Sequence, residues 1–399
     1  MLIRFLIANA YSIGGTIRTT FMTAGQLARD HEVEIVSVYR FANEPGLELD
    51  PRVRLRTLTD LRPESIGRRR RWAADRPSRL IHLDDSRHPR FNLLTDVALM
   101  RYLRGVRGGV LIGTRPGLNL AIARHADTSA IRIGQDHMNA EGYRAGLLEA
   151  IAADYPALDA VTALTEGTAD RYRELMGPGG RVVCIPNAAP DNDVGRRAQP
   201  GSRVIMAAGG LTRRKGFDRL LRAWALLAPD HPDWSVEIFG DGLEHDALEA
   251  RVHRLGLRRS VRLRGHSPRL MDELTRGSLF AMTSRREGFP MVLLEAMSVG
   301  LPVVAYDCPT GPRDLVSDGV DGYVVPDGRT RLMAEALGRL MDDDDRRRRF
   351  GDAALEKARS YELAAIAGRW EELFGELAAA RRSGPTARRR AAATARVRG

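Results

Sequence analysis

The chain has 399 residues, of which 43% are hydrophobic and 28% charged, and its formal net charge at pH 7 is +11. This length exceeds what one hydrophobic core ordinarily serves, so we expect two domains. The two cysteines, Cys184 and Cys308, are too far apart for a disulfide framework or a zinc site. No apolar run reaches a signal-peptide core or the roughly 18 residues of a membrane span. We therefore expect a soluble, cytoplasmic protein.

The positive charge is concentrated near the end of the chain. Seven arginines lie in the acid-free segment 381–399, which leaves a net charge of +4 for the rest. This segment lacks apolar periodicity, so we predict that it is disordered. Compositional drift toward Arg and Ala is the simplest explanation, and peripheral binding to an anionic membrane at its inner face is the alternative. A second basic run, residues 68–71, is interpreted as a solvated loop, and we expect no nucleic-acid partner.

Predicted strands and helices alternate along the chain, a pattern typical of parallel sheets with helical crossovers. The elements predicted in the first half are a strand at 3–8, a helix at 19–29 and strands at 33–38, 110–112, 130–133, 160–164 and 182–185. Residues 186–202, rich in Pro, Asn, Asp and Gly, are predicted to form an interdomain linker.

A second alternating series follows the linker. Its predicted strands are 204–208, 235–239, 261–264, 279–283 and 302–306, its helices are 217–227, 247–255, 270–275 and 291–299, and a short strand near Tyr323 and further helices follow. The fold class is therefore α/β, with two doubly wound Rossmann-like domains facing each other across a cleft. We expect a first domain at 1–190, a second at 202–362, helices at 363–380 that cross back to the first domain, and the tail at 381–399.

Doubly wound sheets often bind dinucleotides, but the fingerprint for that function is missing. Gly14 and Gly15 are adjacent after the first strand, where G-x-G-x-x-G would be needed, and the second strand ends without an acid for a ribose. The later "FGDGLEHD" has Glu244 and His245 where the third glycine belongs. These departures argue against an oxidoreductase.

Phosphate-binding chemistry is predicted instead at "AAGGLTRRKGFDRLL". There a strand, a glycine pair, a basic cluster and a helix start would bring backbone amides and cations to a diphosphate. Of the 62 basic residues only Lys215 and Lys357 are lysines. A position with no geometric demand would nearly always be Arg in this chain, so Lys215 indicates a need for a compact ammonium.

Two carboxylates, Glu287 and Glu295, flank the helix start in "REGFPMVLLEAM". Pro290 favours the first helical position, which would leave Glu287 in a loop and Glu295 inside the helix. Eight residues rotate a helix by about 80 degrees, so the two need not share a face. The carboxylate of Glu287 and the amides of Gly288 and Phe289 could bind sugar hydroxyls. Glu295, in an apolar helix, would need a partner such as a ribose diol.

Residues 202–330 resemble the donor domain of the family-4 retaining glycosyltransferases with the glycosyltransferase-B fold. The resemblance rests, in order, on "GGLTRRKGFD", "EIFGDG", "VRLRGH", "EGFPMVLLE", "AMSVGLPVVAYD" and "VSDGVDGYVVP". The first half diverges more, although "SIGGTIRTTFMTAGQLA" is similar to the family's glycine loop and first helix. The resemblance implies retaining transfer of a sugar from a nucleotide diphosphate sugar to an acceptor hydroxyl, in cell-envelope glycan or glycoconjugate biosynthesis.

The resemblance also implies roles for individual residues. Glu287 would hold the donor sugar and Glu295 the ribose, while Lys215 with either Arg213 or Arg214 would hold the diphosphate. Gly15 would approach the phosphate closely. The family commonly has an arginine where this chain has Gly210, so the choice between the two arginines stays open.

His137 follows a predicted strand of the first domain. A histidine at such a place is often structural, but the family carries an active-site histidine there, which implies that His137 orients the donor sugar, with Asp136 as a weaker companion. His266 is a candidate for the border of the nucleotide base.

We expect no metal and no cofactor, because Lys215, arginine and helix N-termini could supply the positive charge for the leaving diphosphate. The acidic run in "MDDDDRRRRF" is interpreted as a self-paired solvated surface rather than a metal site. A nucleotide-sugar-binding protein without transfer activity and a nucleotide-sugar isomerase stay open as alternatives. Neither the base nor the sugar follows from the motifs. The unknown acceptor would be selected by loops near residues 40–46, 62–92 and 114–119.

Overall fold

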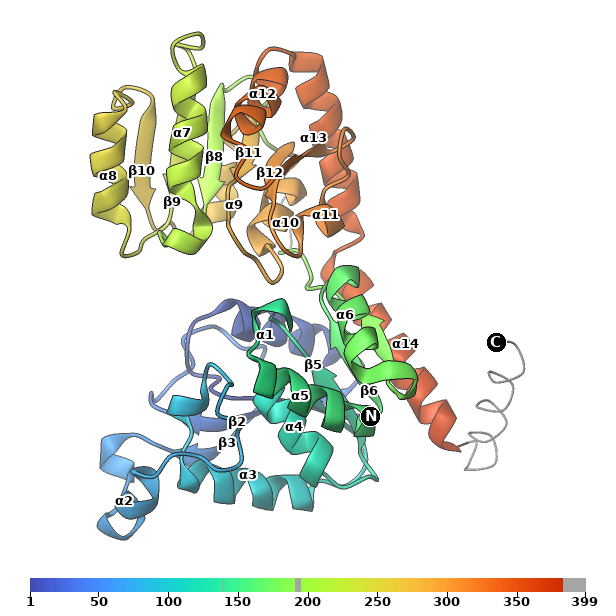
Figure 1. Ribbon diagram of the computed structural model, residues 1–399. Coiled ribbons are helices and arrows are strands. Elements are labelled where there is room, and N and C mark those ends of the chain that lie inside the picture. Colours follow the sequence, from blue (N-terminus) through green and yellow to red (C-terminus); the bar gives the residue numbers. More distant parts are fainter. Residues whose placement is uncertain (139, 191–194, 383–399) are drawn as a thin grey trace. The chain divides into compact units, whose positions relative to one another are not determined.

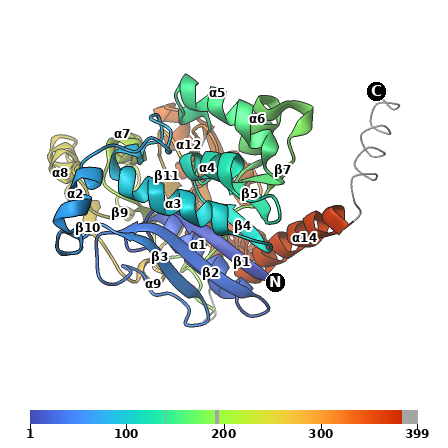
Figure 2. The ribbon, with the colours of Figure 1, turned by 90° about the horizontal axis from the view of Figure 1, so that it is seen from below.

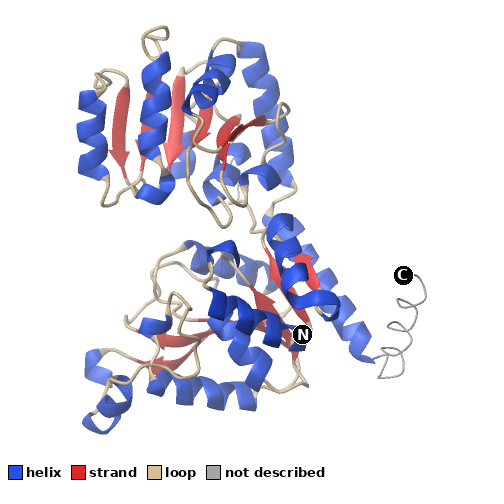
Figure 3. Ribbon diagram, in the orientation of Figure 1, coloured by secondary structure: helices blue, strands red, loops and turns tan. Residues whose placement is uncertain are grey.

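The computed structural model describes residues 1–138, 140–190 and 195–382, and it divides into two compact units (Figure 1). The first unit contains Met1–Pro186 and the chain from Ala364 onward, and the second contains Asn187–Leu363. In each unit, helices surround a central sheet (Figure 3). None of the helices in the described ranges is long and apolar enough to cross a membrane.

The first unit has a seven-stranded parallel sheet with the strand order β3-β2-β1-β4-β5-β6-β7. Its strands are β1 (Leu2–Ile7), β2 (Glu32–Arg40), β3 (Arg54–Asp60), β4 (Val110–Gly113), β5 (Ile131–Gln135), β6 (Ala160–Ala163) and β7 (Val182–Cys184). Six of them were predicted to within a few residues. The sequence analysis missed β3, because "RLRTLTD" has no apolar run and lies at the edge of the sheet, where its side chains stay partly exposed.

Helices cover both faces of this sheet. They are α1 (Gly15–Leu27), α2 (Arg68–Ala74), α3 (Leu93–Gly105), α4 (Pro116–His125), α5 (Ala145–Asp154), α6 (Glu166–Met176) and α14 (Leu363–Arg382). Side chains alternate along β1, so that Leu6 joins the core that contains Leu99 of α3. Phe5 points to the opposite face, where its ring meets Trp370 of α14 edge to face, with the ring centroids 6.4 Å apart. Figure 2 shows this unit from below, with α3 and α14 well separated.

The predicted start of the first helix and the predicted start of the tail are both corrected. Helix α1 begins at Gly15, four residues before the expected start at Thr19. Arg381 and Arg382, which we had assigned to a disordered tail, lie in α14. The Arg381 guanidinium donates hydrogen bonds to the backbone carbonyls of residues 128–130 and, at 2.7 Å, to the carboxylate of Asp159. Residues 383–399 of the predicted tail lie outside the described residues.

The second unit has a six-stranded parallel sheet with the order β10-β9-β8-β11-β12-β13. Its strands are β8 (Val204–Ala208), β9 (Ser235–Phe239), β10 (Val261–Gly265), β11 (Leu279–Met282), β12 (Val303–Asp307) and β13 (Gly322–Pro326). Its helices are α7 (Phe217–Leu227), α8 (His245–Arg254), α9 (Leu270–Leu274), α10 (Met291–Ser298), α11 (Pro312–Leu315), α12 (Thr330–Met341) and α13 (Asp344–Arg359). The prediction of two parallel α/β sheets is therefore confirmed.

Two further segments differ from their predicted character. Residues 195–202, in the predicted linker, are attached to the second unit, because the amides of Ala198 and Gln199 donate to the carbonyls of Val299 and Thr275. The run of acids and arginines in α13 does pair with itself at i, i+3 spacing. However, Arg347 is buried rather than solvated, and its guanidinium donates to the carbonyls of residues 200, 340 and 341.

Each sheet has one point at which the strand order reverses. In the first unit it lies between β1 and β4, and in the second between β8 and β11. Parallel sheets of this kind bind ligands outside the carboxyl ends of the two strands at that point, because the connections leave those strands in opposite directions. These two reversal points are therefore where the fold favours binding sites.

Candidate functional site

The predicted basic loop and the predicted loop acid meet at the reversal point of the second unit. Residues 209–216 follow β8 and residues 283–290 follow β11. The Lys215 ammonium lies 2.7 Å from one carboxylate oxygen of Glu287, and the Arg214 guanidinium lies 3.2 Å from the other. The Ser284 hydroxyl donates a hydrogen bond of 2.6 Å to the same carboxylate. Three of the predicted site residues thus form one charged cluster.

The cluster is buried mainly on its acidic side. The Glu287 side chain is 4% exposed and that of Lys215 is 15% exposed, whereas that of Arg214 is 55% exposed. A carboxylate this deep requires partners, and Lys215 and Ser284 provide them. Two cations around one carboxylate leave a net positive charge at the surface of the site, which favours an anionic ligand.

The backbone of the basic loop adopts a conformation that requires glycine. Gly216 has φ of 68°, and a Cβ added there would lie 2.1 Å from the carbonyl oxygen of Thr283. This close approach brings the two loops together. Arg285 fixes the same junction, because its guanidinium donates to the carbonyl of Arg213 at 2.6 Å and pairs with both carboxylate oxygens of Asp218 at 2.8 Å.

Arg213 and Arg214, between which the sequence could not decide, have different surroundings. Arg214 contacts Glu287, whereas Arg213 lines a pocket of about 440 Å³ together with Glu244 and Arg251. Only Arg214 therefore shares the cluster with Lys215. We had placed Pro290 at the first helical position, but it caps α10, which begins one residue later.

The remaining predicted residues of the second unit lie beside the cluster in sequence. Glu295 is buried in α10, as its apolar neighbours predicted. The ring of Phe289 packs against that of Tyr361 at 6.5 Å, so its side chain has a structural role, and Gly288 before it is partly exposed. Burial, with a smaller contribution from the nearby charge of Glu287, raises the pKa of Cys308 to about 12. His266 is exposed after β10.

Two further candidates lie at the carboxyl edge of the first unit. Gly15 begins α1 directly after the β1 loop, and a Cβ at Gly14 or at Gly15 would meet no protein atom within 4 Å. The packing of the protein therefore does not explain these glycines. His137 follows β5, and both of its ring nitrogens are buried without a hydrogen-bond partner in the described structure. Burial lowers the pKa of His137 to about 4, so the ring is neutral near pH 7.

The neighbour of His137, Asp136, is the centre of a buried cluster that the sequence analysis missed. Its carboxylate accepts hydrogen bonds from the hydroxyl of Tyr143 at 2.8 Å, from the hydroxyl of Tyr172 and from the amide of Met138. Burial raises the pKa of Asp136, and these hydrogen bonds oppose the shift. The cluster fixes the end of the strand that carries His137. No sequence motif marks Tyr172, which comes from α6.

No group of three or more His, Cys, Asp or Glu side chains in the described ranges is arranged to hold a metal ion.

Two parallel α/β sheets in succession are consistent with the glycosyltransferase-B fold, and an ammonium, a guanidinium and a carboxylate lie together at the reversal point of the second sheet. The chain's relationships agree with this class. Residues 191–357 match the family model described as "Glycosyl transferases group 1".

Similar proteins extend the match over most of the chain. An exopolysaccharide phosphotransferase of Streptomyces coelicolor is 36% identical over 96% of this chain, although the chain spans only 41% of that protein. An amylovoran biosynthesis glycosyltransferase of Erwinia amylovora is 29% identical over 60% of this chain and 68% of its own length. The crystal structure of Anabaena HepE in complex with UDP superposes with a TM-score of 0.74 at 18% identity, covering 94% of this chain and 100% of that one. This last likeness shows the shared fold.

Proposed function

We propose that this protein is a retaining glycosyltransferase of family 4 that moves a sugar from a nucleotide diphosphate sugar to an acceptor hydroxyl. The observation that carries the proposal is the cluster of Lys215, Arg214 and Glu287 at the reversal point of the second sheet. The names of the Streptomyces and Erwinia relatives support a role in the biosynthesis of cell-envelope or extracellular glycans.

In this proposal the donor binds at the second unit. Lys215 and Arg214 bind the diphosphate, since a compact ammonium and an exposed guanidinium are suitable partners for phosphate oxygens. Glu287, with the amides of Gly288 and Phe289, binds hydroxyls of the sugar. Glu295 binds the ribose.

Three residues have supporting roles in the proposal. Gly15 lets a phosphate approach the start of α1, in keeping with the open space around it. His137 orients the donor sugar through its unpaired ring nitrogens. Arg213 is the weaker of the two arginine candidates for the diphosphate, because it lines a different pocket.

The proposed reaction breaks the bond between the anomeric carbon and the diphosphate oxygen. The acceptor hydroxyl forms the new bond on the face from which the diphosphate leaves, and its proton departs with the diphosphate. The ammonium of Lys215 and the guanidinium of Arg214 stabilise the negative charge that develops on the leaving group. We therefore propose a metal-independent reaction.

A thermal-shift panel of UDP, GDP and ADP sugars tests donor binding. A ligand that binds only the folded state raises the free energy of unfolding by about 2.7 kcal/mol at a hundredfold excess over its dissociation constant. Lys215→Ala and Glu295→Ala should each abolish the shift, and a full shift in both variants would refute the site. Slow donor hydrolysis separates an enzyme from a binding protein, and NMR of the product would reveal an isomerase.

The name of the Streptomyces relative raises a second reaction, transfer of a sugar phosphate instead of a sugar. Mass spectrometry of the product distinguishes the two, because only the second leaves a nucleoside monophosphate. Release of a nucleoside monophosphate would contradict the proposed glycosyl transfer.

Peripheral attachment to an anionic membrane also stays a proposal. It rests on the arginines of the final segment, of which five lie beyond residue 382 and so outside the described residues. Co-sedimentation with vesicles that contain phosphatidylglycerol tests it.

A further inference from the structure

The reversal point of the first sheet has an unusual distribution of positive charge. Arg115 lies two residues after β4 and precedes α4, at the carboxyl end of one of the two strands that define this point. Its guanidinium pairs with Asp85, which is buried and also accepts a hydrogen bond of 2.9 Å from the amide of Gly117. Asp85 thus fastens the long segment between β3 and α3 to the reversal point.

Two arginines lie shortly after Asp85 in the sequence, and no acidic side chain among the described residues balances their positive charge. Arg87 and Arg90 are exposed, and neither has an ion-pair partner among the residues that the structure describes. Phe91 packs edge to face on Tyr39 with the ring centroids 5.2 Å apart, which holds Arg90 near the carboxyl end of β2. Burial raises the pKa of Tyr39, and the charges of Arg115, Arg87 and Arg90 oppose that shift.

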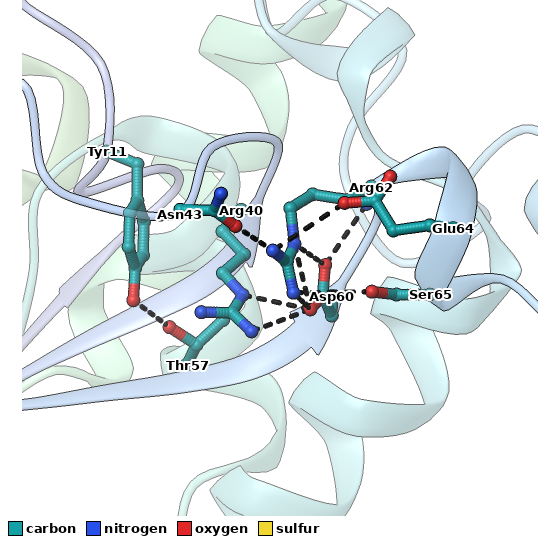
Figure 4. A network of polar contacts seen from close by, with 8 residues as sticks. All are labelled: Tyr11, Arg40, Asn43, Thr57, Asp60, Arg62, Glu64 and Ser65. Atoms are coloured by element: carbon teal, nitrogen blue, oxygen red, sulfur yellow. Dashed lines mark hydrogen bonds and ion pairs between the residues drawn. The ribbon is translucent and has the colours of Figure 1, made fainter.

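Three other arginines near this edge are paired with acidic side chains. Figure 4 shows Arg40 and Arg62 sharing the carboxylate of Asp60, with nitrogen to oxygen distances of 2.7 Å for each, and Glu64 lies 3.6 Å from Arg62. Two cations and two anions leave this network without net charge. Arg144 is likewise 3.3 Å from Asp84. Arg87 and Arg90 differ from these three arginines, because no carboxylate among the described residues forms an ion pair with them.

The sequence shows that this excess is local. Segment 62–92 contains nine arginines and four acids, and 114–119 adds one arginine, whereas 40–46 is neutral. The net charge of these three segments is thus +6. The chain before residue 381 has a net charge of only +4, so the remainder of it is negative. The positive charge of the chain before residue 381 is therefore concentrated in the segments that we expect to select the acceptor, where residues 68–71 supply four of the ten arginines just counted and Arg87 and Arg90 two.

We infer that the acceptor is an anionic saccharide, one that carries a phosphate or pyrophosphate group, and that Arg87 and Arg90 bind this group at the carboxyl edge of the first sheet. This inference rests on the proposed function, because it assigns the acceptor of the same reaction. Arg115 is a positioning residue here, since its charge is already paired with Asp85. The two free guanidiniums can each present two parallel donors to phosphate oxygens.

The test uses inorganic pyrophosphate as the probe, in a Lys215→Ala/Arg214→Ala background, so that neither proposed diphosphate ligand of the second unit contributes. Isothermal titration calorimetry at low ionic strength compares Arg87→Gln/Arg90→Gln with the control Arg101→Gln/Arg104→Gln. The control pair is exposed on α3, and it removes the same charge from another part of this unit. We expect the first double variant to weaken binding by about tenfold or more and the control by less than about twofold. Equal effects, or no effect of the first pair, would overturn the inference.

Two further measurements identify the source of the anion. With Lys215 and Arg214 intact, nucleoside diphosphate affinity should be unchanged in Arg87→Gln/Arg90→Gln; a parallel loss would assign these arginines to the donor instead. Binding to phosphatidylglycerol vesicles should also be unchanged. A loss of vesicle binding with pyrophosphate binding intact would make this edge a membrane contact and overturn the inference. Failure of the donor site itself would appear separately, as no nucleotide binding by the wild-type protein.

Discussion

The ion pair between Lys215 and Glu287 predicts that one substitution will strengthen nucleotide binding and abolish sugar transfer. In the free protein the carboxylate of Glu287 forms an ion pair of 2.7 Å with the Lys215 ammonium, the group that we assign to the donor diphosphate. The diphosphate must therefore compete with a carboxylate that belongs to the protein. Glu287→Gln removes this competitor and keeps the shape of the side chain. We expect the variant to bind nucleoside diphosphate more tightly while it loses sugar transfer.

The size of the effect follows from the contacts. A hydrogen bond to a charged group contributes about 1.5–3 kcal/mol. When Glu287→Gln removes the competing carboxylate, nucleotide binding gains only part of this free energy, because Arg214 and Ser284 also contact that carboxylate. A recovery of about 1.4 kcal/mol corresponds to a tenfold lower dissociation constant. Lys215→Met should raise the dissociation constant by at least about tenfold. Glu287→Gln should also lower the free energy of unfolding by about 2 kcal/mol, because Lys215 then lies partly buried without its partner.

Isothermal titration calorimetry measures both variants with whichever of UDP, GDP or ADP binds the wild-type protein. Glu335→Gln is the matched control, since Glu335 is exposed on α12 and the substitution changes the net charge equally. The reasoning is refuted if Glu287→Gln weakens nucleotide binding as much as Lys215→Met does. It is also refuted if the control tightens binding to the same extent.

Three further predictions concern stability. Gly216→Ala should lower the free energy of unfolding in urea by about 3 kcal/mol, because the added Cβ would collide with a carbonyl oxygen. Gly328→Ala is the control, since Gly328 has φ of 72° and open space around it, and it should lower the free energy of unfolding by only about 1 kcal/mol. Similar losses in the two variants would contradict this prediction. Between pH 6.5 and 4 the unfolded chain binds more protons at His137 than the folded chain does, so the free energy of unfolding should fall by up to about 3 kcal/mol as the pH falls. Urea unfolding of His137→Gln should lack this pH-dependent component. An identical pH profile in the variant and the wild-type protein would contradict the buried neutral ring. A chain that ends at residue 380 loses the hydrogen bonds of Arg381, so it should be about 2 kcal/mol less stable in thermal or urea unfolding than a chain that ends at Arg382. Equal stability of the two chains would show that these hydrogen bonds do not hold α14 in place.

The sequence predicted those parts of the fold that depend on local patterns. The sequence marked twelve of the thirteen strands, and central strands such as β4, β6 and β11, which are buried throughout, read as short apolar segments. Strand β3 was missed because Arg and Thr interrupt its apolar residues, which leaves "RLRTLTD" without an apolar run. The sequence could not predict that Arg381 is ordered, because the carbonyls that accept its hydrogen bonds belong to a loop some 250 residues earlier.

The candidate site was predictable to a similar degree. The scarcity of lysine singled out Lys215, and the motif with Glu287 implied a shared ligand, but not that the two residues would pair with each other. The different surroundings of Arg213 and Arg214 required coordinates, because adjacent residues on a short turn point in different directions. The tyrosines around Asp136 come from elements far apart in the sequence, and their hydroxyls carry no signature that a single sequence reveals.

A crystal structure with a bound nucleoside diphosphate tests the central claim most directly. The account predicts phosphate oxygens within hydrogen-bond distance of the Lys215 ammonium at the carboxyl ends of β8 and β11, with Glu287 displaced from that nitrogen. A nucleotide bound elsewhere, with the pair between Lys215 and Glu287 intact, would contradict it.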